Sequence, residues 1–201
     1  MTTEVIEHGL ELERIYRRMK ANRHPAAVGL QAKKRFVPGE GSLTPRFVLV
    51  GEAPGRTENA TGKPFIGAAG EVLNGMLRAA RLRRDHDVFI TNVVKYWPTV
   101  INSDLLATRR PSLGEMLAFR PWLIKELKAL NCPRIILLGV TAQQVFWPAG
   151  KIAAPERGEW AKLPDLPFRA VMLYHPAVGC YQPSKRPQLY AEFRKAVEDA
   201  G

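Results

Sequence analysis

Four short apolar runs in the chain are rich in β-branched residues and show no alternation with polar ones. They span residues 46–50, 88–93, 134–138 and 170–174. Strands of this kind are buried on both faces, as in a parallel sheet that helices cover. Segments with helical spacing of apolar residues lie between or after them, at 72–80, 112–130, 141–146 and 187–199. This alternation predicts an α/β fold with three α/β/α layers around a four-stranded, mostly parallel central sheet.

The segment before the first run is expected to form a helix that packs on this core. Apolar residues recur at helical spacing among charged ones over residues 5–21, for example at Leu12, Ile15 and Met19. A chain of 201 residues suits one domain with a sizeable core, so we expect a single domain over residues 1–201. Within the later helix at 112–130, Pro121 predicts a break or a kink.

Residues that suit a ligand site follow the ends of the predicted strands. Gly51, Asn92, Gly139 and His175 stand where the four strands end. In open α/β sheets, ligands bind outside the carboxyl ends of the strands. We therefore expect the functional site at this edge of the sheet.

The charge of the chain favours a polyanionic partner. Thirty Lys and Arg against 19 Asp and Glu give a formal net charge of +11, which points first to nucleic acid and second to an acidic membrane surface. No apolar stretch of about 18 residues and no signal-peptide pattern occurs, so we expect no membrane partner and a cytoplasmic protein. The two cysteines form no C-x-x-C pair, which agrees with a reducing compartment.

A glycine-rich loop follows the first predicted strand, from Gly51 to Gly70. Its glycines let the backbone approach a ligand closely, and it leads into a helix N-terminus, which favours anions. Neither the phosphate-loop pattern nor the G-x-G-x-x-G pattern occurs in it, and no carboxylate pair for Mg²⁺ stands in register. A nucleotide-dependent transferase is therefore a disfavoured alternative.

Three motifs stand at the predicted strand ends. The loop contains Gly-Glu-Ala-Pro-Gly at 51–55 and Gly-Lys-Pro-Phe-Ile-Gly at 62–67, the second strand reads Ile-Thr-Asn-Val-Val-Lys at 90–95, and His-Pro-Ala stands at 175–177. Their order and spacing resemble the family 4 uracil-DNA glycosylases over roughly residues 36–198. The resemblance implies a monofunctional DNA glycosylase of DNA repair. Such an enzyme flips out a uracil-type or modified pyrimidine base and hydrolyses its N-glycosidic bond, leaving an abasic site.

The resemblance also implies roles for three side chains in such a pocket. His175 would stabilise the negative charge that develops on the departing base. Asn92 would read the Watson–Crick edge of the flipped pyrimidine, because a carboxamide offers one donor and one acceptor side by side. Phe65 would supply the face on which the base stacks. Without the family context, a strand-end His, a turn-forming Asn and a core Phe are equally reasonable readings.

The carboxylates and backbone of the first motif complete the expected site. Glu52 and Glu58 are the carboxylates available to orient water or to stabilise the sugar cation, and the sequence does not separate them. The backbone N–H groups around Ala53, Pro54 and Gly55 are expected to help hold the base oxygen.

Several basic residues are expected to contact DNA phosphates. The segment 178–187 resembles the family's loop that presses into the duplex. The segment between Pro98 and Pro111 is expected to form a loop longer than the family's, which would open the pocket to a bulkier, hypermodified base. The predicted DNA contacts are Lys95, Asn102, Arg109, Arg110, Lys185 and Arg186.

The cysteines depart from the family pattern. Family 4 enzymes bind a four-iron, four-sulfur cluster through four cysteines, whereas this chain has only Cys132 and Cys180, and Tyr96 and Phe119 stand at two of the four places. The sequence therefore predicts that the cluster is absent, that no cofactor or metal is bound, and that aromatic packing replaces the cluster. We expect a monomer. A relative that binds DNA without cutting it stays an alternative.

Overall fold

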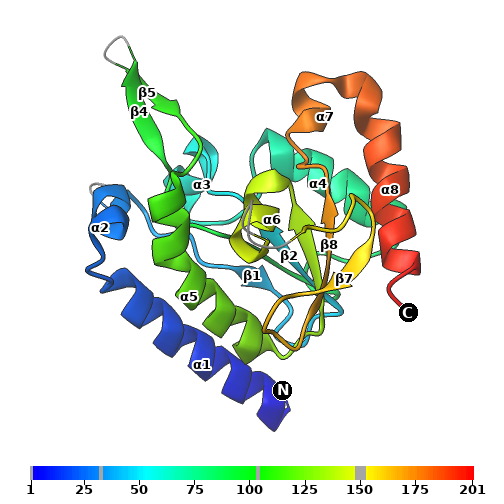
Figure 1. Cartoon of the computed structure of the whole chain (residues 1–201), viewed down its shortest axis with the longest axis horizontal. Coiled ribbons are helices and arrows are strands. Elements are labelled where there is room, and N and C mark those ends of the chain that lie inside the picture. The colour runs from blue at the N-terminus through cyan, green and yellow to red at the C-terminus, as the bar shows by residue number, and fades with distance from the viewer. Residues whose placement is uncertain (1, 32–33, 103–104, 148–152) are drawn as a thin grey trace.

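The computed structural model describes residues 2–31, 34–102, 105–147 and 153–201 (Figure 1). Its helices are α1 (Thr3–Lys20), α2 (Pro25–Gln31), α3 (Arg56–Thr61), α4 (Ala68–Ala79), α5 (Leu113–Leu130), α6 (Val140–Phe146), α7 (Val178–Tyr181), the 3-10 helix η1 (Pro183–Lys185) and α8 (Arg186–Glu198). Its strands are β1 (Glu40–Gly41), β2 (Phe47–Gly51), β3 (Val88–Asn92), β4 (Thr99–Asn102), β5 (Leu105–Thr108), β6 (Arg134–Leu138), β7 (Trp160–Lys162) and β8 (Arg169–Leu173).

A six-stranded sheet lies at the centre, in the order β1-β3-β2-β6-β8-β7. The four inner strands run parallel, and the edge strands β1 and β7 pair antiparallel with their neighbours. The inner strands are the four predicted ones, so the mostly parallel α/β/α fold is confirmed, but the predicted number of strands was wrong. Edge strands of two or three residues are too short to show the period of two by which strands are recognised.

Alternate residues of each inner strand supply the two halves of the core. In β2, Val48 and Val50 pack with α1, α2, α5 and α6, whereas Phe47 and Leu49 pack with α4 and α8 on the other face. Figure 1 shows these helices on the two sides of the sheet. The predicted N-terminal helix is present as α1, and it contacts α5.

The segment between β3 and α5 folds as a hairpin, where the sequence predicted a loop. Strands β4 and β5 pair antiparallel, with Thr99 opposite Thr108 and Val100 opposite Ala107 (Figure 1). The β-branched run at 99–101 was the available signal for a strand. The foot of the hairpin lies next to the site described below, through Thr108.

Helix α5 begins with a capping box formed by Ser112 and Glu115. Glu115 N donates to Ser112 Oγ over 3.2 Å, and Ser112 N donates to Glu115 Oε2 over 2.6 Å. The helix continues through Pro121 to Leu130, so the proline does not break it. In the described ranges, no helix has the length and apolar character needed to cross a bilayer.

Candidate active site

A cavity of about 550 Å³ opens at the carboxyl ends of β2, β3 and β8. This is the edge of the sheet at which the sequence predicts the site. Ten of the predicted residues border the cavity: Arg109 and Arg110 of the DNA contacts, and eight residues of the catalytic and base-binding set. The eight are Glu52, Ala53, Pro54, Gly55, Glu58, Phe65, Asn92 and His175.

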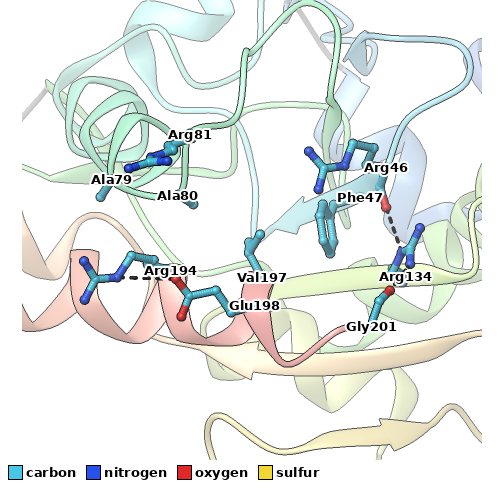
Figure 2. Close-up of a pocket in the computed structure, with 10 residues that line it drawn as sticks. All are labelled: Arg46, Phe47, Ala79, Ala80, Arg81, Arg134, Arg194, Val197, Glu198 and Gly201. Carbon is cyan, nitrogen blue, oxygen red and sulfur yellow. Dashed lines mark hydrogen bonds and ion pairs between the residues drawn. The ribbon is translucent and has the colours of Figure 1, made fainter.

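Another cavity, of about 810 Å³, lies at the amino ends of β2 and β6 (Figure 2). Arg46, Arg81, Arg134 and Arg194 line it, and it contains none of the predicted site residues. It is the larger of the two, but size alone does not make a site. We place the candidate active site in the smaller cavity, because polar groups of different kinds converge there.

Phe65 is held in an uncommon backbone conformation at the wall of the cavity. Its φ is 50°, in the left-handed region that residues other than glycine rarely adopt. Gly51 and Gly70 make room for it, because a Cβ on Gly51 would lie 2.4 Å from the Phe65 ring and one on Gly70 would lie 2.0 Å from the Phe65 carbonyl oxygen. The Phe65 and His175 ring centres lie 5.7 Å apart at an interplanar angle of 33°.

Asn92 ends β3 with its carboxamide at the cavity. The residue is only 2% exposed, and its Oδ1 has no hydrogen-bond partner among the described residues. Buried polar atoms in native proteins are nearly always paired, so an unpaired acceptor in a residue that borders a cavity is a candidate partner for a ligand donor.

His175 follows β8 and is fixed in one tautomer. Its Nδ1 accepts the Ala177 N–H over 3.1 Å, so in the neutral ring Nε2 carries the proton. The residue is half-buried at the cavity, and desolvation by burial lowers the pKa of His175 from its usual 6.5 to about 4. The imidazole is therefore neutral at pH 7 and can donate a hydrogen bond from Nε2.

The lowered pKa of His175 predicts a loss of stability in acid. Between pH 6.5 and 4 the unfolded chain binds a proton that the folded chain does not, so the contribution is present above pH 6.5 and is lost as the pH falls. The loss on reaching pH 4 is up to about 3 kcal/mol. Urea unfolding of the protein and of His175→Gln at pH 7 and pH 4.5 measures it. The variant is expected to lose less stability, and equal losses would contradict the assignment.

The two predicted carboxylates have different surroundings. Glu58 is buried, and three backbone N–H groups donate to its oxygens: those of Gly55 over 3.0 Å, Ile66 over 3.1 Å and Gly67 over 2.8 Å. Its carboxylate thus holds the glycine-rich loop together, with both oxygens engaged.

Glu52 is half-buried at the cavity, and only one of its oxygens is engaged. Thr141 Oγ1 donates to Glu52 Oε2, and Arg110 Nε lies 3.7 Å from the same atom. Among the described residues, no hydrogen bond reaches Oε1. The geometry therefore distinguishes two residues that the sequence could not: both oxygens of Glu58 are engaged, whereas Glu52 has one oxygen without a hydrogen-bond partner among the described residues.

The backbone donors of the first motif are fewer than predicted. The Gly55 N–H donates to Glu58, and Pro54 has no N–H to offer. The prediction that the Gly55 N–H faces the base was therefore wrong. Of the three residues named in the prediction, Ala53 is the one whose N–H can still serve as the predicted donor.

Of the predicted DNA contacts, Lys95 was placed wrongly. Its side chain is fully buried, and Nζ donates to Glu126 Oε2 over 2.7 Å. A lysine without exposed surface cannot reach a phosphate. The sequence missed this because the carboxylate partner lies 31 residues away, on α5.

Four of the other predicted DNA contacts are at least partly exposed, and two of them, Arg109 and Arg110, border the cavity. Arg110 is exposed, whereas Arg109 forms two hydrogen bonds with Glu115, of 2.7 and 2.5 Å, and is only partly available. Arg186 is exposed, and Lys185 is half-buried. The sixth, Asn102, ends β4, and its side chain lies outside what the structure describes.

Two further residues that the sequence did not single out bear on the site. Tyr181 borders the cavity and is 84% exposed, which is unusual for so large a ring. Arg84 donates to the Pro64 carbonyl over 2.6 Å and to Asn74 Oδ1 over 3.1 Å, and so braces the segment before Phe65. An aromatic residue in a polar loop was a usable signal for Tyr181, whereas nothing in the sequence marked Arg84.

The sequence model of the uracil DNA glycosylase superfamily matches residues 38–201. The chain belongs to this superfamily. A type-4 uracil-DNA glycosylase of Archaeoglobus fulgidus is 34% identical over 183 residues, which cover 85% of each protein. One of Pyrobaculum aerophilum is 34% identical over 169 residues, or 81% of this chain and 80% of the relative. One of Thermotoga maritima is 39% identical over 121 residues, or 60% and 59%. The predicted family is confirmed.

Similarity to the type-4 uracil-DNA glycosylases contradicts the prediction that the protein has no cofactor. The relatives are type-4 uracil-DNA glycosylases, a family whose enzymes bind an iron–sulfur cluster. The residues of this chain do not fit a cluster with four cysteine ligands. The whole sequence has two cysteines, Cys132 is buried, and Tyr96 and Phe119 pack edge to face with ring centres 6.1 Å apart. In the described part of the chain, no group of three or more His, Cys, Asp or Glu could hold a metal.

Proposed function

We propose that the protein excises uracil from DNA by hydrolysing the N-glycosidic bond of a flipped nucleotide. The observation that supports this most is that Phe65, Asn92 and His175 line one cavity, in a chain of the uracil DNA glycosylase superfamily. A stacking face, a base-reading amide and a neutral donor are the groups that such a reaction needs.

Uracil is read by its complementarity to the Asn92 carboxamide. Uracil offers an N3–H donor next to its O4 acceptor, and a carboxamide offers the matching oxygen and NH₂ group. The buried Oδ1, which has no partner among the described residues, accepts the N3–H. Cytosine carries an acceptor at N3 and would leave this oxygen unpaired, which costs about 1–3 kcal/mol or more in a buried site. The base stacks on Phe65.

The chemical step separates charge, and the site matches both signs. The bond between C1′ and N1 breaks, its electron pair leaves with the base, and the neutral His175 donates a hydrogen bond from Nε2 to the negatively charged O2. A water molecule held by Glu52 Oε1 bonds to C1′ and gives its proton to that carboxylate. The products are an abasic site and uracil, which takes a proton from solvent.

Tyr181 is proposed to support the flipped nucleotide from the duplex side. Its exposed ring stands at the mouth of the cavity, in the segment that precedes Lys185 and Arg186. Side chains that insert between base steps offset the cost of unstacking, which is a few kcal/mol per step. A single strand does not carry that cost.

The change Tyr181→Ala is therefore expected to act on duplex DNA alone. It should lower kcat/KM on uracil-containing duplexes by about 10-fold, since stacking is worth about 1–3 kcal/mol per base. Single-strand excision should change less than about 2-fold, and Tyr181→Phe should restore the duplex rate. Steady-state excision on matched single-stranded and duplex oligonucleotides measures this. Equal losses on both would remove the proposed role.

A modified pyrimidine is a second candidate substrate. The hairpin supports it, because Thr108 and the adjoining Arg109 and Arg110 border the cavity and leave it with about 550 Å³. Base release, detected by mass spectrometry, from DNAs that carry uracil, hypoxanthine or modified pyrimidines tests the proposal. Release of uracil is expected. Tight binding without release of any base would favour a DNA-binding relative that does not cut.

A further inference from the structure

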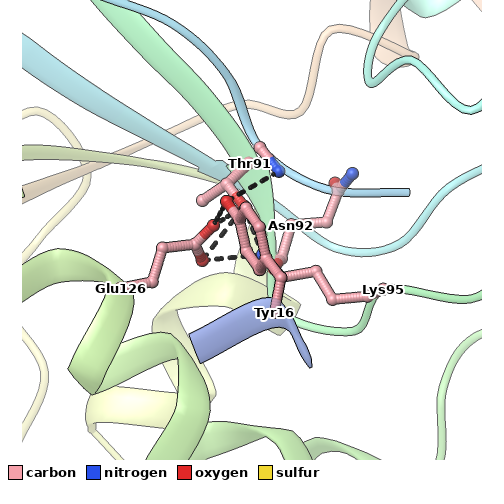
Figure 3. A network of polar contacts seen from close by, with 6 residues as sticks. Tyr16, Thr91, Asn92, Lys95 and Glu126 are labelled. Carbon is pink, nitrogen blue, oxygen red and sulfur yellow. Dashed lines mark hydrogen bonds and ion pairs between the residues drawn. The ribbon is translucent and has the colours of Figure 1, made fainter. Parts of the chain in front are cut away.

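A polar network lies next to Asn92 (Figure 3), and three of its members, Thr91, Lys95 and Glu126, are fully buried. Lys95 Nζ donates to Glu126 Oε2 over 2.7 Å, to the Asn92 carbonyl oxygen over 3.0 Å and to Thr91 Oγ1. Thr91 Oγ1 in turn donates to the Glu126 carboxylate over 3.1 and 3.2 Å. On the outer side, Tyr16 OH donates to Glu126 Oε1. The network thus joins α1, α5 and the end of β3.

A buried ion pair of this kind is an expensive way to hold a fold together. Lys95 and Glu126 are both 0% exposed, and burying two charges costs several kcal/mol each before their attraction and hydrogen bonds offset it. Apolar residues of similar volume often do as well for stability. Lys95 Nζ donates three hydrogen bonds, one for each of its protons. The ion pair therefore holds the acceptors of these bonds at fixed positions.

The position fixed most directly is the backbone of Asn92. Pairing with β2 holds this residue on one side, where Gly51 lies opposite it and Val93 N donates to the Gly51 carbonyl over 2.9 Å. Its own carbonyl accepts from Lys95, at the point where the chain leaves the sheet. The carboxamide oxygen has no partner among the described residues, so the direction in which it points depends on how firmly its backbone is held.

We propose that Lys95, anchored by Glu126, is a positioning residue for Asn92 and thereby sets how efficiently the enzyme excises uracil. The inference rests on the proposed function, in which Asn92 reads the base. A displacement of about 1 Å of a positioned group can cost about 100-fold in rate. Loosening the carbonyl of Asn92 thus lowers excision through the base-reading contact.

A double-mutant cycle tests this coupling. The change Lys95→Met with Glu126→Leu removes the network without leaving one buried charge unpaired, so the fold should survive, as circular dichroism would show. In the otherwise unchanged protein it should lower kcat/KM for uracil by about 10- to 100-fold. In an Asn92→Ala background it should change the remaining activity by less than about 3-fold, because the group that it positions is gone.

The control is Tyr16→Phe, which removes a hydrogen bond to the same carboxylate but leaves Lys95 and Asn92 in place. It should change excision by less than about 2-fold. If the network substitutions lower activity equally in both backgrounds, their role is structural and the inference is wrong. If Asn92→Ala has no effect on uracil excision, the proposed function is what fails.

Discussion

Replacement of His175 by alanine is expected to lower kcat for uracil release by about 100- to 1000-fold, with little change in KM. The reason is that a neutral donor aimed at the base oxygen acts mainly as negative charge develops on the departing base, and hardly in the ground state. The ring is neutral because burial lowers its pKa to about 4, and Ala177 N–H fixes its tautomer. Single-turnover excision from a uracil-containing oligonucleotide measures the effect.

The pH dependence provides a second readout of His175. Because the folded ring stays neutral down to about pH 4, its titration should not reduce the rate anywhere between pH 5 and 8. Unchanged affinity of His175→Ala for the DNA product would show that the site is otherwise intact. A loss of kcat below about 5-fold would mean that another group carries the charge of the departing base.

The two loop glutamates are expected to respond in opposite ways to the same change. Glu52→Gln should lower kcat by about 100-fold or more while leaving the unfolding midpoint almost unchanged, because a carboxamide cannot take a proton from water. Glu58→Gln should lower the free energy of unfolding by about 2 kcal/mol, because its carboxylate accepts three backbone N–H groups and an amide has only one acceptor oxygen. Any loss of activity in Glu58→Gln should follow from the loosened loop.

The catalytic rate and the free energy of unfolding, measured on both variants, show which glutamate acts in catalysis and which stabilises the loop. Each protein serves as the control for the other, since the substitution is identical and the residues lie six positions apart in one loop. A large rate loss in a stable Glu58→Gln protein, together with a fully active Glu52→Gln, would reverse the assignment of the water-binding carboxylate.

The sequence predicts the inner sheet because its information is local. Strand β2 is an unbroken apolar run, and its residues are buried on both faces, so composition and position agree. The edge strands and the hairpin have weaker signals in the local sequence, and they form strands because of the segments with which they pair. Pro121 likewise suggested a break in α5. The helix is continuous because its apolar face packs on α1, α2 and the core.

For the site, the sequence identifies the residue types but not their partners. The motifs predict that Phe65, Asn92 and His175 serve one pocket, and all three border the same cavity. The surroundings of Glu52 depend on Thr141 and Arg110, and the burial of Lys95 depends on Glu126. These partners lie far away in the chain. Contacts at such separation have no local signature in the sequence. Only the folded structure therefore distinguishes a carboxylate with an unengaged oxygen from a buried one whose oxygens are both hydrogen-bonded.

A crystal structure of the Glu52→Gln protein with uracil-containing DNA tests the central claim most directly. The account predicts an extruded uracil stacked on Phe65, its N3–H within hydrogen-bond distance of Asn92 Oδ1 and its O2 within reach of His175 Nε2. A uracil bound outside this cavity, or inside it with its Watson–Crick edge turned away from Asn92, would contradict the account.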